Sequence, residues 1–246
     1  MLLYPNAKIN LGLNVVRKRS DGYHDIETLF YPVSSLCDIL ELTLSDKFEM
    51  HVYQAEIAGE NICEKAWRLM HAHFGIPPVS IHLYKKIPMG AGLGGGSSDA
   101  AFTLAGLNDL FGLKIPQDDL AALAAGLGSD CAFFIYNRPM LARGRGEILT
   151  PFDFSLEGHR LQICPQDVFV STREAYAGIT PHKPAHRLES VLKQPVDKWK
   201  DLLVNDFEAT VFRTHPELAV AKEALYAGGA RYAAMTGSGS ALFAIY

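Results

Sequence analysis

Polar and apolar residues alternate near the start of the chain. The apolar members are Ile9, Leu11, Leu13 and Val15, and the residues between them are Lys8, Asn10, Gly12 and Asn14. A period of two is typical of a half-buried strand, in which every second side chain points to the same face. Lys8 and Asn10 therefore share one face of the predicted strand. That face is either a solvated surface, which is the usual place for a lysine, or part of a functional site.

Further strands and helices follow in an order that indicates an α+β domain. Strands are predicted within residues 26–44, 48–53 and 79–84, and helices over 61–74, 102–111 and 117–127. Because the strands come first and the helices after them, we expect the helices to pack on one face of a sheet. A hairpin is predicted over 142–149, between Pro139 and Pro151.

The pattern changes after Pro151, where a second unit of strands and helices is predicted. A strand is predicted over 160–164, helices over 171–178, 188–193, 197–212 and 216–227, and a loop over 179–187. Two short apolar strands follow within 232–246, joined by the small residues 236–240. This last segment is either a plain hairpin or a second loop that can approach a phosphate closely.

Residues 88–101 form the segment that most clearly points to chemistry. Their sequence is Pro-Met-Gly-Ala-Gly-Leu-Gly-Gly-Gly-Ser-Ser-Asp-Ala-Ala, and it lies between a predicted strand and a predicted helix. Glycine allows close approach of the backbone to a ligand, and the first amides of a helix have no internal partner. Ser97 and Ser98 fit the cap or first turn of that helix. The segment predicts a phosphate site; the alternative is a flexible linker or tight turn.

Two well-known nucleotide loops do not fit this segment. A Walker A loop ends in Gly-Lys-Ser/Thr, whereas Gly96 is followed directly by Ser97. The spacing Gly90-x-Gly92-x-x-Gly95 matches the dinucleotide-binding fingerprint. That fingerprint also requires a second strand, about 20 residues further on, that ends in an aspartate or glutamate. A second helical pattern follows instead, so a Rossmann unit is not expected.

Asp130 is a candidate for a catalytic carboxylate. It follows the turn Gly126-Leu-Gly-Ser and precedes the apolar run 131–135, which we interpret as a strand. An aspartate at such a position is either a turn or cap residue or an exposed reactive group. The residues alone leave both interpretations open.

Composition and charge exclude several classes of protein. The chain has 246 residues, of which 48% are hydrophobic and 20% charged, and this is typical of a soluble protein with one large or two medium domains. A net charge of −4 argues against a broad nucleic-acid or anionic-membrane surface. No apolar stretch is long enough to span a bilayer and no cleavable leader is recognisable, so a cytoplasmic location is expected.

Metal sites and disulfides are not expected. The four cysteines are widely spaced without a Cys-x-x-Cys pair, and the nine histidines show no ligand spacing. Any polyanion must then be held by local charge. The candidates for that charge are Lys8, Lys85, Lys86, Arg143 and Arg145.

Three segments together resemble the motifs of the GHMP small-molecule kinases. They are Pro5-Asn-Ala-Lys-Ile-Asn-Leu-Gly-Leu, residues 88–98 and Met235-Thr-Gly-Ser-Gly-Ser, in the order and spacing of that family. The resemblance implies a two-domain GHMP kinase fold of the α+β class. Residues 1–150 would form an ATP-binding and catalytic domain similar to ribosomal protein S5 domain 2. Residues 151–246 would form a ferredoxin-like domain, shortened at its end relative to the family.

The resemblance also implies roles for individual residues. Lys8 and Asp130 match the catalytic pair of the family. The expected ATP-binding residues are Asn61, Lys85, Pro88, Met89, Gly90, Ala91, Gly92, Leu93, Gly94, Gly95, Gly96, Ser97 and Ser98. The expected substrate-binding residues are Asn10, Tyr23, His24, Phe30, Thr172 and Tyr176, with a cytosine between the rings of Tyr23 and Tyr176.

The segment Asp21-Gly-Tyr-His is similar to family members that phosphorylate a cytidyl-bearing alcohol in non-mevalonate isoprenoid synthesis. ATP is the implied co-substrate, and Mg²⁺ is expected with it, with Ser98 as a candidate ligand and no dedicated metal cage. Two alternatives remain from the sequence. One is a GHMP kinase for mevalonate, homoserine or a sugar, and the other is a non-catalytic nucleotide-binding module. Oligomeric state is not predicted.

Overall fold

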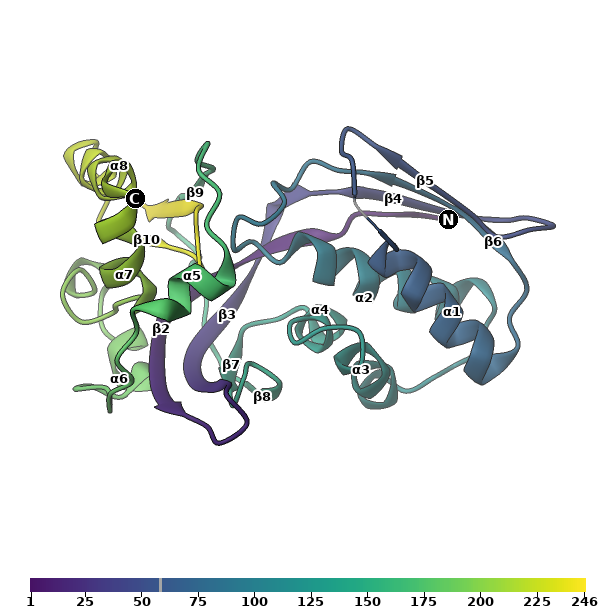
Figure 1. Ribbon diagram of the computed structural model, residues 1–246, viewed down its shortest axis with the longest axis horizontal. Helices are drawn as coiled ribbons and strands as arrows, with labels where there is room; N and C mark the ends of the chain where they lie inside the picture. Colours follow the sequence, from purple (N-terminus) through teal and green to yellow (C-terminus); the bar gives the residue numbers. More distant parts are fainter. Residues whose placement is uncertain (58) are drawn as a thin grey trace. The chain divides into compact units, whose positions relative to one another are not determined.

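The computed structural model describes residues 1–57 and 59–246, and they form two compact units that interleave along the sequence (Figure 1). Unit 1 consists of residues 1–8, 32–88 and 94–138. Unit 2 consists of residues 9–31, 89–93 and 139–246. The chain therefore passes between the units several times. The division at residue 150 stays a prediction, and the packing groups the residues differently.

Unit 1 contains a four-stranded sheet whose strands lie in the order β1-β4-β6-β5. Its strands are β1 (Leu2–Leu3), β4 (Ile39–Leu44), β5 (Glu49–Tyr53) and β6 (Val79–Tyr84). β6 runs antiparallel to β4 and parallel to β5. The helices of this unit are α1 (Ile62–Phe74), α2 (Gly95–Leu110), α3 (Gln117–Ala125) and α4 (Cys131–Tyr136).

The helices of unit 1 share one apolar core with the sheet, as expected from the order of elements. Residues of β4, β6, α1, α2 and α3 belong to a single buried cluster. α2 lies very close to the sheet because residue 106 has no side chain: a Cβ on Gly106 would lie 2.5 Å from Leu3 Cδ1 and 2.7 Å from Leu42 Cδ1. The position of α2, whose first turn is described below, is thus fixed by close packing.

A second sheet has the order β2-β3-β7-β8 and contains the longest strands. Its strands are β2 (Asn6–Lys18), β3 (His24–Cys37), β7 (Met140–Arg143) and β8 (Ile148–Pro151). The β7–β8 hairpin confirms the one predicted over 142–149. The half-buried character expected for the first strand is wrong, because every residue from 6 to 15 of β2 is buried. Lys8 and Asn10 therefore do not lie on a solvated face.

Unit 2 also contains a small antiparallel sheet, β10-β11-β9, and several short helices. The strands are β9 (Leu161–Cys164), β10 (Tyr232–Met235) and β11 (Leu242–Ile245). The helices are α5 (Thr172–Ala177), α6 (Leu188–Leu192), the 3₁₀ helix η1 (Val196–Lys198), α7 (Phe207–Thr214) and α8 (Pro216–Ala227). The terminal hairpin and the helix opened by Pro216 confirm the predictions made for them.

Two predicted elements are wrong. The helix expected over 197–212 is divided into η1 and α7, because Asn205 between them serves tertiary contacts: its Nδ2 donates to the carbonyls of Met235 and Gly237 at 2.7 and 2.9 Å. The run 131–135 forms α4 rather than a strand. A short apolar run buried on most sides does not distinguish the two by periodicity.

No helix within residues 1–57 and 59–246 has both the length and the apolar character that a membrane-spanning helix requires.

Candidate active site

The glycine-rich segment leads into a helix terminus, as its composition predicts. α2 begins at Gly95, seven residues earlier than the helical periodicity indicated, and its N-cap is Gly94 at φ +72°. Ser97 and Ser98 lie in the first turn. The amides at this end of a helix have no carbonyl partner within it and carry the positive end of the dipole. The start of α2 can therefore bind an anion.

Lys8 and Asp130 lie together in unit 1. The Lys8 Nζ is 3.6 Å from Oδ2 of Asp130, and the lysine side chain is 4% exposed against 26% for the aspartate. Burial lowers the pKa of Lys8, while the charge of Asp130 acts in the opposite direction. Asp130 directly precedes α4, so its carboxylate is held at a helix start with a partly open face.

Gly94 brings this pair close to the start of α2. A Cβ on Gly94 would lie 3.1 Å from Lys8 Cγ and 2.9 Å from Cζ of Phe134, the latter in α4. The bare backbone at position 94 thus accommodates both the lysine stem and the ring. A buried ammonium, a partly exposed carboxylate and a helix N-terminus consequently meet in one region of unit 1.

Two further residues predicted for the nucleotide are buried and carry polar atoms that lack a partner among the described residues. Ser98 is 0% exposed, and among the described residues no group hydrogen-bonds its Oγ. Asn61 is the N-cap of α1, where its Oδ1 accepts from the Cys63 amide at 2.8 Å, while its Nδ2 has no partner in the described part of the chain. Each offers an unused polar group to a ligand.

Lys85 is also buried, but its ammonium is already bound. It contacts the carboxylates of Asp38 and Asp99. A direct contact of Lys85 with a nucleotide stays a prediction. Asp38 was not identified from the sequence, where its only signal is a carboxylate between two apolar strands.

In unit 2, Asn10 belongs to a buried polar network. Its Nδ2 donates to Thr28 Oγ1 at 3.1 Å, and its amide donates to Thr236 Oγ1 at 3.1 Å. Thr28 in turn donates to the carbonyl of Gly12. Thr28 and Thr236 were not predicted as site residues. The network shows why polar side chains occur on a strand buried on both faces.

The two glycine-rich segments touch through their backbones. Thr236 Oγ1 donates to the carbonyl of Gly92 at 3.2 Å, and the Ala241 amide donates to the carbonyl of Ala91 at 3.2 Å. A Cβ on Gly92 would lie only 2.1 Å from the carbonyl oxygen of Thr236. Only glycine fits at residue 92 with this packing. Residues 236–240 are therefore more than a plain hairpin turn.

The aromatic residues predicted to hold the substrate contact other side chains of unit 2, and the expected cytosine site stays a prediction. The rings of His24 and Tyr176 are stacked with centroids 4.7 Å apart and 18° between planes. The guanidinium of Arg145 lies 4.7 Å from the ring centroid of Tyr23, a cation–π contact. Burial lowers the pKa of His24, with a smaller contribution from Lys18. One face of the Tyr176 ring is thus in contact with His24.

The other two substrate candidates differ in exposure. Phe30 is 2% exposed, in β3 opposite Met140 of β7. Thr172 is exposed at the start of α5, on the same helix as Tyr176. Their contact with a substrate stays a prediction.

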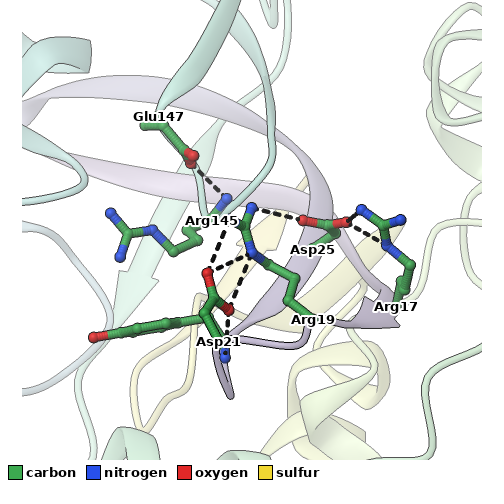
Figure 2. Close-up of polar contacts among 7 residues, drawn as sticks. Arg17, Arg19, Asp21, Asp25, Arg145 and Glu147 are labelled. Atoms are coloured by element: carbon green, nitrogen blue, oxygen red, sulfur yellow. Dashed lines mark hydrogen bonds and ion pairs between the residues drawn. The ribbon is translucent and has the colours of Figure 1, made fainter.

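Ion pairs order the turn that carries Tyr23 (Figure 2). Arg19 contacts Asp21 and Asp25 at 2.9 and 3.2 Å, and Arg17 contacts Asp25 at 2.5 Å. Asp21 Oδ1 also accepts from the Tyr23 amide at 3.1 Å. The backbone of residue 23 is therefore held by a local network, although its ring is exposed. Arg145 approaches from the β7–β8 turn, where its amide donates to Glu147.

Comparisons with known proteins agree with this geometry. The family pattern described as "GHMP kinases N terminal domain" matches residues 61–138, and that described as "GHMP kinases C terminal" matches residues 188–246. A 4-diphosphocytidyl-2-C-methyl-D-erythritol kinase of Bacteroides thetaiotaomicron is 51% identical, over 100% of this chain and 92% of the relative. The chain belongs to the GHMP kinase family. An enzyme with the same name from Porphyromonas gingivalis is 46% identical to this GHMP kinase, over 100% of this chain and 92% of the relative.

Solved structures give the same result for the fold of this GHMP kinase. A crystal structure of 4-(cytidine 5'-diphospho)-2C-methyl-D-erythritol kinase matches with a TM-score of 0.87 and 36% identity, over 100% of this chain and 90% of that one. A crystal structure of mevalonate kinase matches with a TM-score of 0.76 and 13% identity, over 100% of this chain and 91% of that one. At this identity the match supports the fold alone. The predicted two-domain GHMP kinase fold and small-molecule kinase class are confirmed.

Proposed function

We propose that this kinase transfers the γ-phosphoryl group of ATP to the 2-hydroxyl of 4-diphosphocytidyl-2-C-methyl-D-erythritol. The observation that carries the proposal is the Lys8–Asp130 pair, 3.6 Å apart beside the start of α2. Relatives that share about half of their residues with the whole chain, at 51% and 50% identity, carry the name of this enzyme. The cytoplasmic location expected from the sequence remains a prediction.

Asp130 acts on the acceptor hydroxyl in this proposal. Its carboxylate, partly exposed, orients the hydroxyl and accepts its proton. A bond forms between the acceptor oxygen and the γ-phosphorus, and the bond from that phosphorus to the β–γ bridging oxygen breaks, so that ADP leaves. Phosphoryl transfer has a loose transition state, in which positioning and charge stabilisation contribute most.

Lys8 supplies the charge stabilisation. Its ammonium is buried, and a cation in a water-poor region stabilises developing negative charge more strongly than an exposed one. The amides at the start of α2, together with residues 88–98, bind the phosphates of ATP. Asn61 and Lys85 contribute to binding of the nucleotide in this proposal.

Magnesium is part of the proposal because ATP carries it. The partnerless, buried Oγ of Ser98 fits a metal or phosphate ligand at this helix start. Within residues 1–57 and 59–246, no group of three or more histidine, cysteine, aspartate or glutamate side chains is arranged to hold a metal by itself. The ion would accordingly arrive with the nucleotide and neutralise phosphate charge.

The cytidyl part of the acceptor is assigned to Asn10, Tyr23, His24, Phe30, Thr172 and Tyr176. A cytosine bound between Tyr23 and Tyr176 would replace the present contact of His24 with Tyr176. A panel of cytidyl, mevalonate, homoserine and sugar acceptors with labelled ATP tests this choice. Preference for any acceptor without a cytidyl group would contradict it.

The catalytic pair is tested by Asp130→Asn and Lys8→Ala. We expect either change to lower kcat by roughly 10²–10⁴-fold, the usual effect of removing an acid–base or electrostatic group. The measurement is acceptor-dependent ADP release. Asp109→Asn, an exposed aspartate in the last turn of α2, is the matched control and should retain full activity. Near-normal turnover of either site variant would remove the pair from the mechanism.

A further inference from the structure

Unit 1 contains a buried charged cluster, of which the proposed mechanism assigns only Lys85 to the nucleotide. Its members are Asp38, Lys85 and Asp99, which are 0%, 6% and 2% exposed. The ammonium of Lys85 bridges the two carboxylates: it contacts Asp38 Oδ2 and lies 2.6 Å from Asp99 Oδ2. The three residues come from the segment before β4, the end of β6 and the first part of α2.

Asp38 connects two segments of the candidate site through its remaining groups. Its Oδ1 accepts from the amides of Lys86 and Ile87, the latter at 2.8 Å. Its own amide donates to the carbonyl of Pro5 at 2.8 Å. Residues 86 and 87 directly precede the glycine-rich segment, and Pro5 precedes Lys8 by three residues. Asp38 therefore holds the backbone ahead of both, through its carboxylate at residues 86 and 87 and through its own amide at Pro5.

Asp99 connects the cluster to the start of α2. It follows Ser98, and its carbonyl accepts from Thr103 Oγ1 at 2.7 Å within the helix. A Cβ on Gly95 would lie 3.3 Å from Lys85 Nζ, so the ammonium lies directly behind the first turn. The cluster consequently contacts the phosphate-binding end of the helix from its buried side.

Buried charges stabilise a core poorly, because the free energy lost on desolvation can exceed that gained from their attraction. Two carboxylates share one ammonium, and Oδ1 of Asp99 lacks a partner among the described residues. Burial raises the pKa of Asp99, although Lys85 acts against this. Burial also acts to lower the pKa of Lys85, but the two carboxylates outweigh it and the pKa is raised. Apolar residues of similar size often stabilise a core as well or better, so such clusters are best explained by the geometry that they fix.

We propose that Asp38 is a positioning residue for phosphoryl transfer, which acts through Lys85 and Asp99 to fix the segment carrying Lys8, the backbone before the glycine-rich segment and the start of α2. The inference rests on the proposed function, because it concerns the alignment of ATP with the Lys8–Asp130 pair. Asp38 itself touches neither reactant. Its carboxylate contacts the backbone before the glycine-rich segment directly and the start of α2 through Lys85, and its amide contacts the segment carrying Lys8.

The test compares Asp38→Asn and Asp99→Asn with a control at the other end of α2. The amides keep the size of the carboxylates but remove the charges that hold Lys85. Asn108→Ala is the control, because it removes two hydrogen bonds to Ile115, at 3.0 and 3.3 Å, far from the helix start. For the two site variants we expect kcat/KM for ATP to fall by about 10- to 100-fold, as small misplacements of reacting groups do. KM for the acceptor should stay within about twofold, since none of the contacts described for Asp38, Lys85 and Asp99 is with a residue assigned to the acceptor.

Calorimetry without acceptor measures the affinity for a non-hydrolysable ATP analogue. This affinity separates the positioning role of Asp38 from the proposed kinase function. We expect this affinity to fall in Asp38→Asn and to be unchanged in Asn108→Ala. If the unmodified protein binds the analogue but phosphorylates no cytidyl acceptor, the proposed function fails, and the binding comparison still decides the role of the cluster. Equal ATP kinetics and equal analogue affinity in Asp38→Asn and Asn108→Ala would overturn the inference.

A third variant distinguishes a positioning role of the cluster from a role in stability alone. Asp38→Leu/Lys85→Met/Asp99→Leu replaces all three charges by apolar groups of similar size. A folded triple variant with normal ATP kinetics would overturn the inference. Impaired ATP kinetics in a folded triple variant would support it when Asp38→Asn, which keeps Lys85, is impaired as well. If Asp38→Asn or the triple variant does not fold, Asp99→Asn tests the link from Lys85 to α2 by the same ATP kinetics and analogue affinity. This variant leaves the contacts of Asp38 intact, so we expect it to fold.

Discussion

At the scale of single residues, the candidate site depends on which polar groups are left available inside the protein. Ser98 and Asn61 each have a buried polar atom without a partner in the described residues, and both belong to the unit that contains the Lys8–Asp130 pair. Buried polar atoms are normally satisfied. These exceptions therefore mark where a ligand would complete the structure.

Tyr176 provides a prediction at this scale. Tyr176→Ala removes a ring that contacts His24 on one face and the edge of Phe207, at a centroid distance of 4.7 Å. Because stacking of a base on an aromatic ring contributes about 1–3 kcal/mol, KM for the cytidyl acceptor should rise by roughly tenfold or more. Tyr176→Phe, which keeps the ring, should change it by less than about twofold. Steady-state kinetics at saturating ATP measure both, and an unchanged KM in Tyr176→Ala would refute stacking at this residue.

At the scale of elements, the most important feature is a helix that starts inside a glycine-rich segment. The composition of 88–101 and the following apolar periodicity were enough to predict a helix terminus there. They did not give the starting residue, because Gly95 and Gly96 have low helix propensity, and only the tertiary structure shows that Gly95 packs against Ile87.

Gly94 and Gly96 form a matched pair for a second prediction. Gly94→Ala places a Cβ at φ +72° within 2.9 Å of Phe134, so we expect the free energy of unfolding to fall by about 1–3 kcal/mol. A Cβ on Gly96 meets nothing within 4 Å. Gly96→Ala should therefore leave stability unchanged or raise it by up to about 1 kcal/mol. Urea denaturation of both variants measures the difference, and equal stabilities would show that the backbone at residue 94 is not constrained.

Sequence reasoning predicted local elements well and tertiary ones poorly, for identifiable reasons. The hairpin near 142–149 and the helix opened by Pro216 depend on local turn chemistry, and both were correct. The helix predicted over 197–212 was wrong because Asn205 uses its side chain for contacts with residues 235 and 237, which no local pattern reveals. Lys8 and Asp130 were identified through a family resemblance. Asp38 was missed because its contacts lie 47 to 49 residues away in sequence.

At the scale of the whole molecule, the compact units do not correspond to consecutive halves of the sequence. Strands β2 and β3 each contribute residues to both units. In unit 2, Leu13 and Val15 of β2 share a buried cluster with Phe207 and Val211 of α7. The core of unit 2 is therefore incomplete without residues from both ends of the chain.

A fragment of residues 1–150 tests this arrangement. It would lose Phe207, Val211 and the other C-terminal partners of Leu13 and Val15. Exposure of several buried apolar side chains, each worth about 1.5–3 kcal/mol, exceeds much of the stability of a typical domain. We expect the fragment to aggregate or to lack a cooperative thermal transition in circular dichroism, whereas the full chain unfolds cooperatively. A soluble fragment with a sharp transition would favour two consecutive domains divided at residue 150.

The contact between residues 92 and 236 has a consequence for how the sequence can vary. A methyl group at residue 92 would fall on the carbonyl oxygen of Thr236, and the two positions are 144 residues apart. Neither glycine-rich segment can change its backbone path without a matching change in the other. We therefore expect the two segments to tolerate substitution only together, and a graft of one segment alone into a related kinase to clash with the other segment of its host.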